Sequence, residues 1–270
     1  MIINTNAAAS AALYNLDQTN VNLRRSLTRL SSGLRINTAL DDPGGLAVSL
    51  KLSAAIRRTD ATSANVENAL SYLQSQDGVL QAASSILERM SELASSASGA
   101  ASTDDNALYD TEYDELATEL TTLTGEEFNG ISLFANPSST LVVRTSENAS
   151  QTVGITQVDL EDIATAVATG DLTTTSTATD AMAILDTQIQ ALAVLRATNG
   201  AQQSRLTFAQ DILEVNRLNL EAANSQIMDA DIAKESTEYA KNSILAEAGV
   251  AMLAQANTVS ERALKLLEFN

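Results

Sequence analysis

Apolar residues recur at alternating spacings of four and three along the first part of the chain. The leucines in this series are Leu13, Leu16, Leu23, Leu27, Leu30 and Leu34. Such spacing is typical of the a/d seam of a coiled coil, which needs a partner helix to bury it. The alternation returns near the other end, at positions that include Leu245, Met252, Val259 and Leu266. We therefore predict that the two ends form complementary helices, whose seams pack against each other or against neighbouring subunits.

Between these ends the pattern predicts more helices and one change of character. The periodicity predicts helices over residues 4–32, 46–97, 106–124, 180–228 and 232–268. A linker is expected over 35–45, because Pro43 stops a helix. Alternating segments at 140–145 and 151–156 predict a β-hairpin. The expected fold class is mainly α: a long antiparallel helical coiled-coil rod, with the terminal helices paired and a small β-hairpin region.

The amino-acid composition argues against several classes of function. The chain contains no histidine and no cysteine, so the commonest general base and thiolate chemistry are both missing. We therefore expect no enzyme activity, no cofactor and no metal site. The acidic pairs Asp41-Asp42 and Asp229/Asp231 are expected to serve as helix caps and solvated turns. The formal net charge of −18 argues against nucleic acid as a partner, because binding phosphate needs clustered lysine and arginine.

The chain lacks two kinds of targeting segment. No stretch approaches the roughly 20 apolar residues that a membrane-spanning helix needs, so no membrane insertion is expected. The N-terminal sequence Met-Ile-Ile-Asn-Thr-Asn has neither the basic region nor the apolar core of a cleavable signal peptide. If the protein is exported, we expect a different route.

Short motifs at both ends are specific enough to indicate a family. The N-terminal part contains Ile3-Asn4-Thr5-Asn6, then Leu30-Ser-Ser-Gly-Leu-Arg-Ile-Asn37, and then Gly45-Leu46-Ala47. The C-terminal part contains Ile227-Met-Asp-Ala-Asp231 and Leu253-Ala-Gln-Ala-Asn257. These motifs occur in the order found in bacterial flagellins, which the chain resembles over about 1–135 and 180–270. The middle is short, so the large outer domains of many flagellins are expected to be absent.

This resemblance implies a subunit that polymerises with itself into the extracellular filament of the bacterial flagellum. It implies export through the flagellar type III apparatus without cleavage, and partners that include an export chaperone, the filament cap and hook-junction proteins. The expected domains are residues 1–44 with 232–270 as the terminal coiled coil, and 45–137 with 176–231 as the helical rod. Residues 138–175 are expected to form a small hairpin and loop region at the distal part of the rod.

The resemblance alone also implies a receptor as a partner, which a second set of residues would contact. Arg89, Leu93 and Glu112 match positions at which similar flagellins contact a Toll-like innate-immune receptor. The alternative interpretation places Leu93 in a helix seam and the two charged residues on exposed faces.

Two other functions remain open at this point. A hook–filament junction protein shares related end helices, and a secreted adhesin could use the hairpin region to bind a ligand. An enzyme is the least favoured class, because without histidine or cysteine it would need a carboxylate pair in a pocket.

Overall fold

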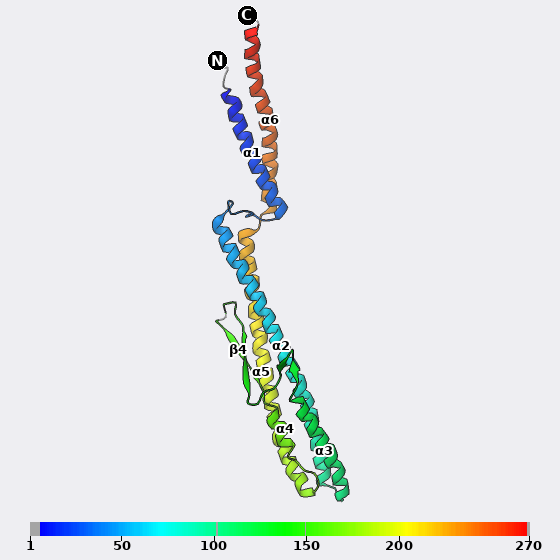
Figure 1. The fold of residues 1–270 in the computed structure, drawn as a ribbon. Helices are drawn as coiled ribbons and strands as arrows, with labels where there is room; N and C mark the ends of the chain where they lie inside the picture. The colour runs from blue at the N-terminus through cyan, green and yellow to red at the C-terminus, as the bar shows by residue number, and fades with distance from the viewer. Residues whose placement is uncertain (1–5, 101, 149, 269–270) are drawn as a thin grey trace. The chain divides into compact units, whose positions relative to one another are not determined.

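The computed structural model describes residues 6–100, 102–148 and 150–268, and it divides into two compact units. Unit 1 comprises Met1–Ala54 with Asn219–Asn270, and unit 2 comprises Ala55–Leu218. The elements, coloured along the chain in Figure 1, are α1 (Ala7–Ser32), α2 (Pro43–Ser98), α3 (Thr103–Leu123), β1 (Glu127–Phe128), β2 (Ile131–Ser132), β3 (Ser139–Arg144), β4 (Thr152–Gln157), α4 (Glu161–Val167), α5 (Thr175–Met228) and α6 (Ile232–Glu268).

The expected mainly α fold, with its terminal helices paired and a small β-hairpin region, is confirmed. Several boundaries differ from the prediction by a few residues. The most informative is the start of α2 at Pro43, because the linker therefore ends at Asp42. Proline is tolerated in the first turn of a helix, where its missing N–H has no intrahelical partner. The Asp42 carboxylate accepts a hydrogen bond from the Gly45 N–H at 2.9 Å and so caps the helix.

Unit 1 is built on the antiparallel pair of α1 and α6 (Figure 1). Asn6 caps the start of α1 by accepting from the Ala9 N–H at 3.1 Å. The helix ends at Gly33, whose φ of 71° is a left-handed conformation that glycine adopts without strain. Beyond it the connector pairs with the end of α5: the Arg35 N–H donates to the Met228 carbonyl at 2.6 Å, and the Ala230 N–H donates to the Gly33 carbonyl at 2.9 Å. These bonds hold together two segments that are far apart in the sequence.

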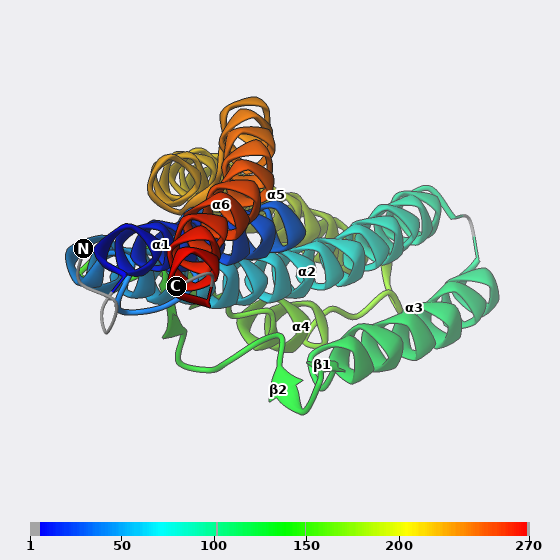
Figure 2. The same cartoon turned by 90° about the horizontal axis from the view of Figure 1, so that it is seen from above.

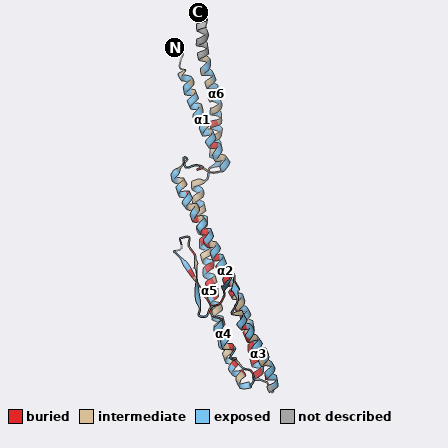
Figure 3. Cartoon of the chain, viewed as in Figure 1, coloured by how far each residue is buried: buried red, intermediate tan, exposed pale blue. Residues whose placement is uncertain are grey.

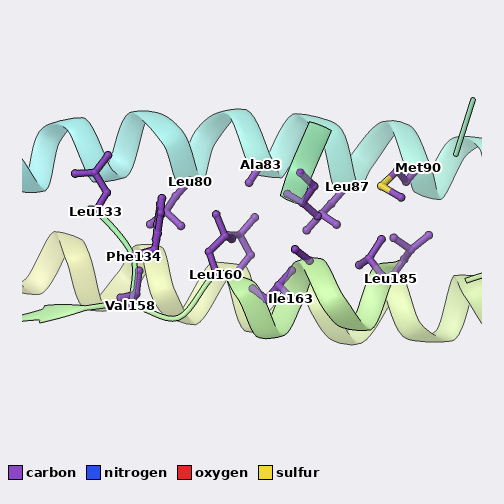
Figure 4. Packing of buried hydrophobic residues seen from close by; sticks show 14 of the residues in the cluster. Leu80, Ala83, Leu87, Met90, Leu133, Phe134, Val158, Leu160, Ile163 and Leu185 are labelled. Carbon is purple, nitrogen blue, oxygen red and sulfur yellow. The ribbon is translucent and has the colours of Figure 1, made fainter. Parts of the chain in front are cut away.

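Unit 2 contains the main apolar core. Figure 4 shows Leu80, Ala83, Leu87 and Met90 on one face of α2, pointing toward a facing layer from other elements. That layer comprises Leu133, Phe134, Val158, Leu160, Ile163 and Leu185. Seen from above, α3 and α4 lie on the same side of α2 (Figure 2). Tyr113 of α3 is buried and donates to the Val167 carbonyl of α4 at 3.0 Å, so the two helices are also joined by a polar contact.

Buried amides set the register between α2 and α5. Asn199 donates to the Leu73 carbonyl at 3.1 Å and to Gln76 Oε1 at 2.8 Å, and Gln76 donates to the Leu133 carbonyl at 2.6 Å. Asn199 and Gln76 are fully buried. Polar residues in a helix seam favour one register, because any shift leaves their hydrogen bonds unmade.

The β segments lie beside this core. Asn129 and Gly130 have φ values of 53° and 77° and form the tight turn between β1 and β2. The longer hairpin pairs β3 with β4 in antiparallel register, for example Leu141 opposite Ile155. Its bounds lie within one residue of the predicted strands. Alternate residues of β4 are buried, so one face of the hairpin packs on the helices.

Candidate assembly surface

The seam between α1 and α6 is narrow and lined mainly by half-buried side chains. Leu16, Leu23 and Leu30 lie half-buried on α1, and Asn6 donates to the Ala256 carbonyl of α6 at 3.0 Å. Gly249 faces Leu16 so closely that an added Cβ would lie 3.1 Å from Leu16 Cδ1. A glycine here allows the two helices to approach more closely than a larger residue would.

The predicted seam differs from the observed one at four positions. Leu13 is 56% exposed, Leu27 54%, Leu245 47% and Met252 64%, so the single chain leaves these side chains largely uncovered. The neighbouring small residues on α1 are better covered: Ala12 is half-buried and Ser26 is only 4% exposed.

The reason is geometric. An ideal helix drifts by about 20° per heptad relative to a 3.5-residue repeat, so the positions that face a partner change along its length. The small residues also permit a closer approach than leucine. Leu34 is half-buried in the connector, where it pairs with Asp229 in an isolated β-bridge. Val259 and Leu266 lie outside the described side chains. A role for these positions in packing between subunits stays a prediction.

A polar cluster fixes the connector beneath α1. The carboxylate of Asp41 accepts from the Thr38 hydroxyl at 2.9 Å and from the backbone N–H groups of Thr38 and Asn37. Arg25 and Arg29 lie 3.8 and 3.9 Å from the same carboxylate, and Arg29 also lies 3.7 Å from Glu235. The hydrogen bond from the Thr38 hydroxyl is the largest of the influences that hold the pKa of Asp41 below its usual value. Asp42 therefore caps α2, and Asp41 stabilises the connector by hydrogen bonds and ion pairs. This agrees with the capping and turn role expected from the sequence.

Much of unit 1 remains uncovered. Among the described residues, Ile36 is the one buried apolar side chain of this unit, whereas twelve of its large apolar side chains are exposed. Figure 3 shows the contrast: the described parts of α1 and α6 are mostly pale blue and tan with a few isolated red positions, whereas red patches recur along unit 2. Within the described ranges, none of the helices combines the length and apolar character that crossing a membrane requires.

The three residues that the resemblance implies for receptor contact lie in two different environments. Arg89 donates to Glu112 Oε1 from Nε at 2.9 Å and from Nη2 at 2.8 Å, and it also pairs with Glu92 at 3.0 Å. The carboxylate of Glu112 is the main influence that raises the pKa of Arg89. Leu93 is only 3% exposed and belongs to the core. The structure thus brings Arg89 and Glu112 together on the surface and covers Leu93.

Sequence reasoning missed part of this surface. The basic cluster of Arg24, Arg25 and Arg29 predicts ion pairs between subunits with acidic residues such as Glu235. The structure places Arg29 3.7 Å from Glu235 within one chain, a pairing that sequence reasoning did not anticipate. The buried Ser26 and Asn242 had no signal in the sequence, because isolated polar residues in helices are common and usually solvated.

Comparison with known proteins agrees with this architecture. Residues 3–139 match the bacterial flagellin N-terminal helical region, and residues 182–267 match the bacterial flagellin C-terminal helical region. The chain is 37% identical to a flagellin of Halalkalibacterium halodurans, with 99% of this chain and all of that protein covered. It is 35% identical to the flagellar filament 33 kDa core protein of Treponema phagedenis, with the same coverage.

A solved structure extends the likeness to three dimensions. The crystal structure of Bacillus cereus flagellin superposes with a TM-score of 0.51 and 31% sequence identity, covering 55% of this chain and 88% of that one. Family models that together span most of the chain, and relatives aligned along its whole length, lead to one conclusion. The chain belongs to the bacterial flagellin family.

Proposed function

We infer that this chain is the structural subunit of a flagellar filament and that it polymerises with copies of itself. Membership of the flagellin family supports this function. The observation that assigns this function to particular residues is the exposure of twelve large apolar side chains in unit 1. Exposed apolar surface of this extent marks a protein contact, and a polymer supplies the contact with neighbouring copies.

The kind of contact between subunits determines the form of the assembly. When two different surfaces of identical subunits bind each other without closing a ring, the product is an open helical filament. The exposed leucines of α1 and the exposed side chains of α6, such as Met252, lie on different helices of unit 1. Packing them against neighbours would bury apolar area that the single chain leaves in water, at about 25 cal/mol per Å².

We assign filament contacts to the terminal part formed by residues 1–44 and 232–270. Residues 45–137 with 176–231 form the rod in this proposal, and residues 138–175 its distal hairpin region. The proposal also includes secretion without a cleaved signal peptide, through the flagellar export apparatus, with an export chaperone, the filament cap and hook-junction proteins as partners. A junction protein or an adhesin is not favoured, because the full-length relatives named above are a flagellin and a filament core protein.

A receptor contact is a separate part of the proposal. Because Leu93 is buried, a Toll-like innate-immune receptor would meet Arg89 and Glu112. Binding of the receptor ectodomain to the Arg89→Ala variant, compared with the unchanged chain, tests it. Equal affinity would remove Arg89 from the contact.

Negative-stain electron microscopy with short filament seeds tests the main function. The full chain is expected to extend the seeds into long, uniform filaments. Leu27→Glu and Met252→Glu place a charge on exposed positions of unit 1 and are expected to prevent extension. Leu108→Glu is the matched control, since Leu108 is also exposed, at 72%, but lies on α3 in unit 2. Particles of the unchanged chain that never extend a seed would overturn the filament function.

A further inference from the structure

The outer side of α5 carries an apolar stripe that the described residues of unit 2 leave exposed. Phe208 is 68% exposed, Ile212 60% and Val215 56%, and we call these three residues the α5 outer stripe. They follow one another at spacings of four and three, as in a seam. Leu206 and Leu213 on the opposite side of the same helix are buried. A helix that is apolar on two sides is normally buried on two sides, so the outer stripe lacks its partner.

A separate part of unit 2 offers an apolar recess. It lies between α2, the β1–β2 turn and the β3–β4 hairpin and has a volume of about 430 Å³. We call it the hairpin groove. Its apolar lining includes Tyr72, Phe128, Ile131, Leu141, Val142 and Ile155. Ile131 is 45% exposed and Val142 67%, so the groove opens toward solvent. Its volume is large enough to accept aromatic or branched side chains from another molecule.

Charges beside the two surfaces are complementary. Arg205 lies one helical turn before Phe208 and is exposed. Glu127 is exposed and directly precedes Phe128, which lines the groove. Neither forms an ion pair with any described residue. Only 16 lysines and arginines balance 34 acidic residues in this chain. An acidic surface is the natural complement of an exposed arginine such as Arg205.

We propose that the α5 outer stripe of one copy docks in the hairpin groove of a second copy, with Arg205 of the first facing Glu127 of the second. The proposal rests on the filament function and names a contact that unit 2 adds to those of the terminal helices. The two surfaces lie on different elements of the same unit. The contact is thus heterologous and each copy uses both surfaces, which is the kind of contact that an open helical filament requires. Phe208 is the central anchor, because buried aromatic side chains dominate interface energies.

Exchanging the charges tests the pairing. Arg205→Glu and Glu127→Arg are each expected to raise the critical concentration for polymerisation about tenfold, because like charges then meet across the contact. The double variant Arg205→Glu/Glu127→Arg restores opposite charges and is expected to return to within about threefold of the unchanged chain. Arg57→Glu is the matched control, since Arg57 is also exposed and has no ion pair among the described residues. Single variants that polymerise as well as this control, or a double variant worse than both, would overturn the proposal.

A crosslink provides a second test that does not disturb Phe208. The chain has no cysteine, so Ser204→Cys near the stripe and Thr140→Cys near the groove would introduce the only thiols. A short bis-maleimide added to filaments of this double variant is expected to give a ladder of dimers, trimers and longer chains on a denaturing gel. Each single variant is expected to give dimers at most, and dilute monomer treated in the same way measures linkage within one chain.

The two tests separate the pairing from the function. Filaments that form normally but give no ladder beyond the dimer would overturn the pairing and leave the filament function in place. Failure of the unchanged chain to extend seeds would overturn the function itself.

Discussion

Units 1 and 2 are built from the same kind of long helix but differ in how far they bury their apolar residues. In unit 2 the described residues form a continuous core, which includes Leu80, Leu87 and Met90 at 0% exposure. Ile36 is the single buried apolar side chain described in unit 1. Burial is the main source of folding free energy, so unit 2 can be stable by itself, whereas unit 1 depends on what its neighbours cover. Helical periodicity alone does not distinguish a self-sufficient domain from an assembly element.

The sharpest test of this difference is one substitution made in each unit. Leu87→Ala creates a cavity in the unit 2 core and is expected to lower the free energy of unfolding by about 3 kcal/mol. Leu23→Ala lies in the half-buried seam of α1, and in the monomer it is expected to cost less than about 1 kcal/mol. Urea unfolding of the monomer, followed by far-UV circular dichroism, measures both. Equal losses would show that unit 1 has a core of its own strength.

Limited proteolysis provides a control for the same two substitutions. Leu23→Ala is expected to change cleavage within the filament more than in the monomer, because neighbouring copies complete the surface around α1. Leu87→Ala is expected to speed cleavage in both states.

Substitution of two asparagines, one in each unit, is expected to give the next largest difference in stability. Asn199→Ala leaves Gln76 Oε1 without its Asn199 donor and Gln203 Nε2 without its Asn199 acceptor, and the expected loss is about 2 kcal/mol. Asn6→Ala removes the cap of α1 and the bond to Ala256, with an expected loss of about 1 kcal/mol. Thermal unfolding of the monomer measures the first, and dissociation of filaments on heating measures the second. A larger loss from Asn6→Ala in filaments than from Asn199→Ala in the monomer would reverse the order of stability that we assign to the units.

The sequence predicted the elements well because their signals are local. The hairpin and the long helices follow from alternation and from helical periodicity within each segment, and the observed bounds differ by a few residues. The tight turn at Asn129-Gly130 likewise follows from two residues that tolerate positive φ.

The faces of the helices were harder to predict, because a face depends on where a partner lies. Leu13 and Leu27 fit the heptad pattern, yet they are exposed, whereas the neighbouring Ala12 is half-buried and Ser26 is buried. Leu93 matched a family contact position, but in this chain it packs in the core. The α5 outer stripe was missed for a related reason. One seam on that helix explained its periodicity, and the exposure of Phe208 is visible only once the position of α2 is known.

Alkaline pH is expected to weaken unit 2 through Tyr113. Burial of the phenol raises its pKa from 10.0 to about 12. An unfolded chain loses this proton at lower pH than the folded one, so the contribution to stability is complete below about pH 10 and is lost as the pH rises to about 12. Melting temperatures measured across this range are expected to fall, and the fall is expected to be smaller for Tyr113→Phe. An identical pH dependence in both proteins would remove Tyr113 as the cause.

Acid pH is expected to act on unit 1 through Asp41. Its pKa is lowered from 3.8, chiefly by the hydrogen bond from the Thr38 hydroxyl. The contribution to stability is therefore present above about pH 4 and is lost as the pH falls through the lowered pKa. Dissociation of filaments between pH 5 and pH 2 measures it, and Asp41→Asn is expected to flatten the dependence. Thr38→Val, which keeps the carboxylate and removes the hydroxyl donor, is expected to shift the acid transition upward.

The smallest expected effect compares two helical glycines, one in each unit. A Cβ added to Gly200 in α5 meets no atom within 4 Å, whereas one added to Gly249 in α6 would lie 3.1 Å from Leu16 Cδ1. Alanine favours a helix over glycine by about 0.5–1 kcal/mol, so Gly200→Ala is expected to raise the stability of the monomer by that amount. In Gly249→Ala the same gain is offset by the tight contact with Leu16, and we expect no net increase. Gly249→Val, which adds two further carbons at this contact, is expected to separate α1 from α6 and to lower the temperature at which filaments dissociate. If Gly249→Val filaments dissociated at the temperature of the unchanged chain, the close approach of α1 and α6 would not be needed in the assembled filament.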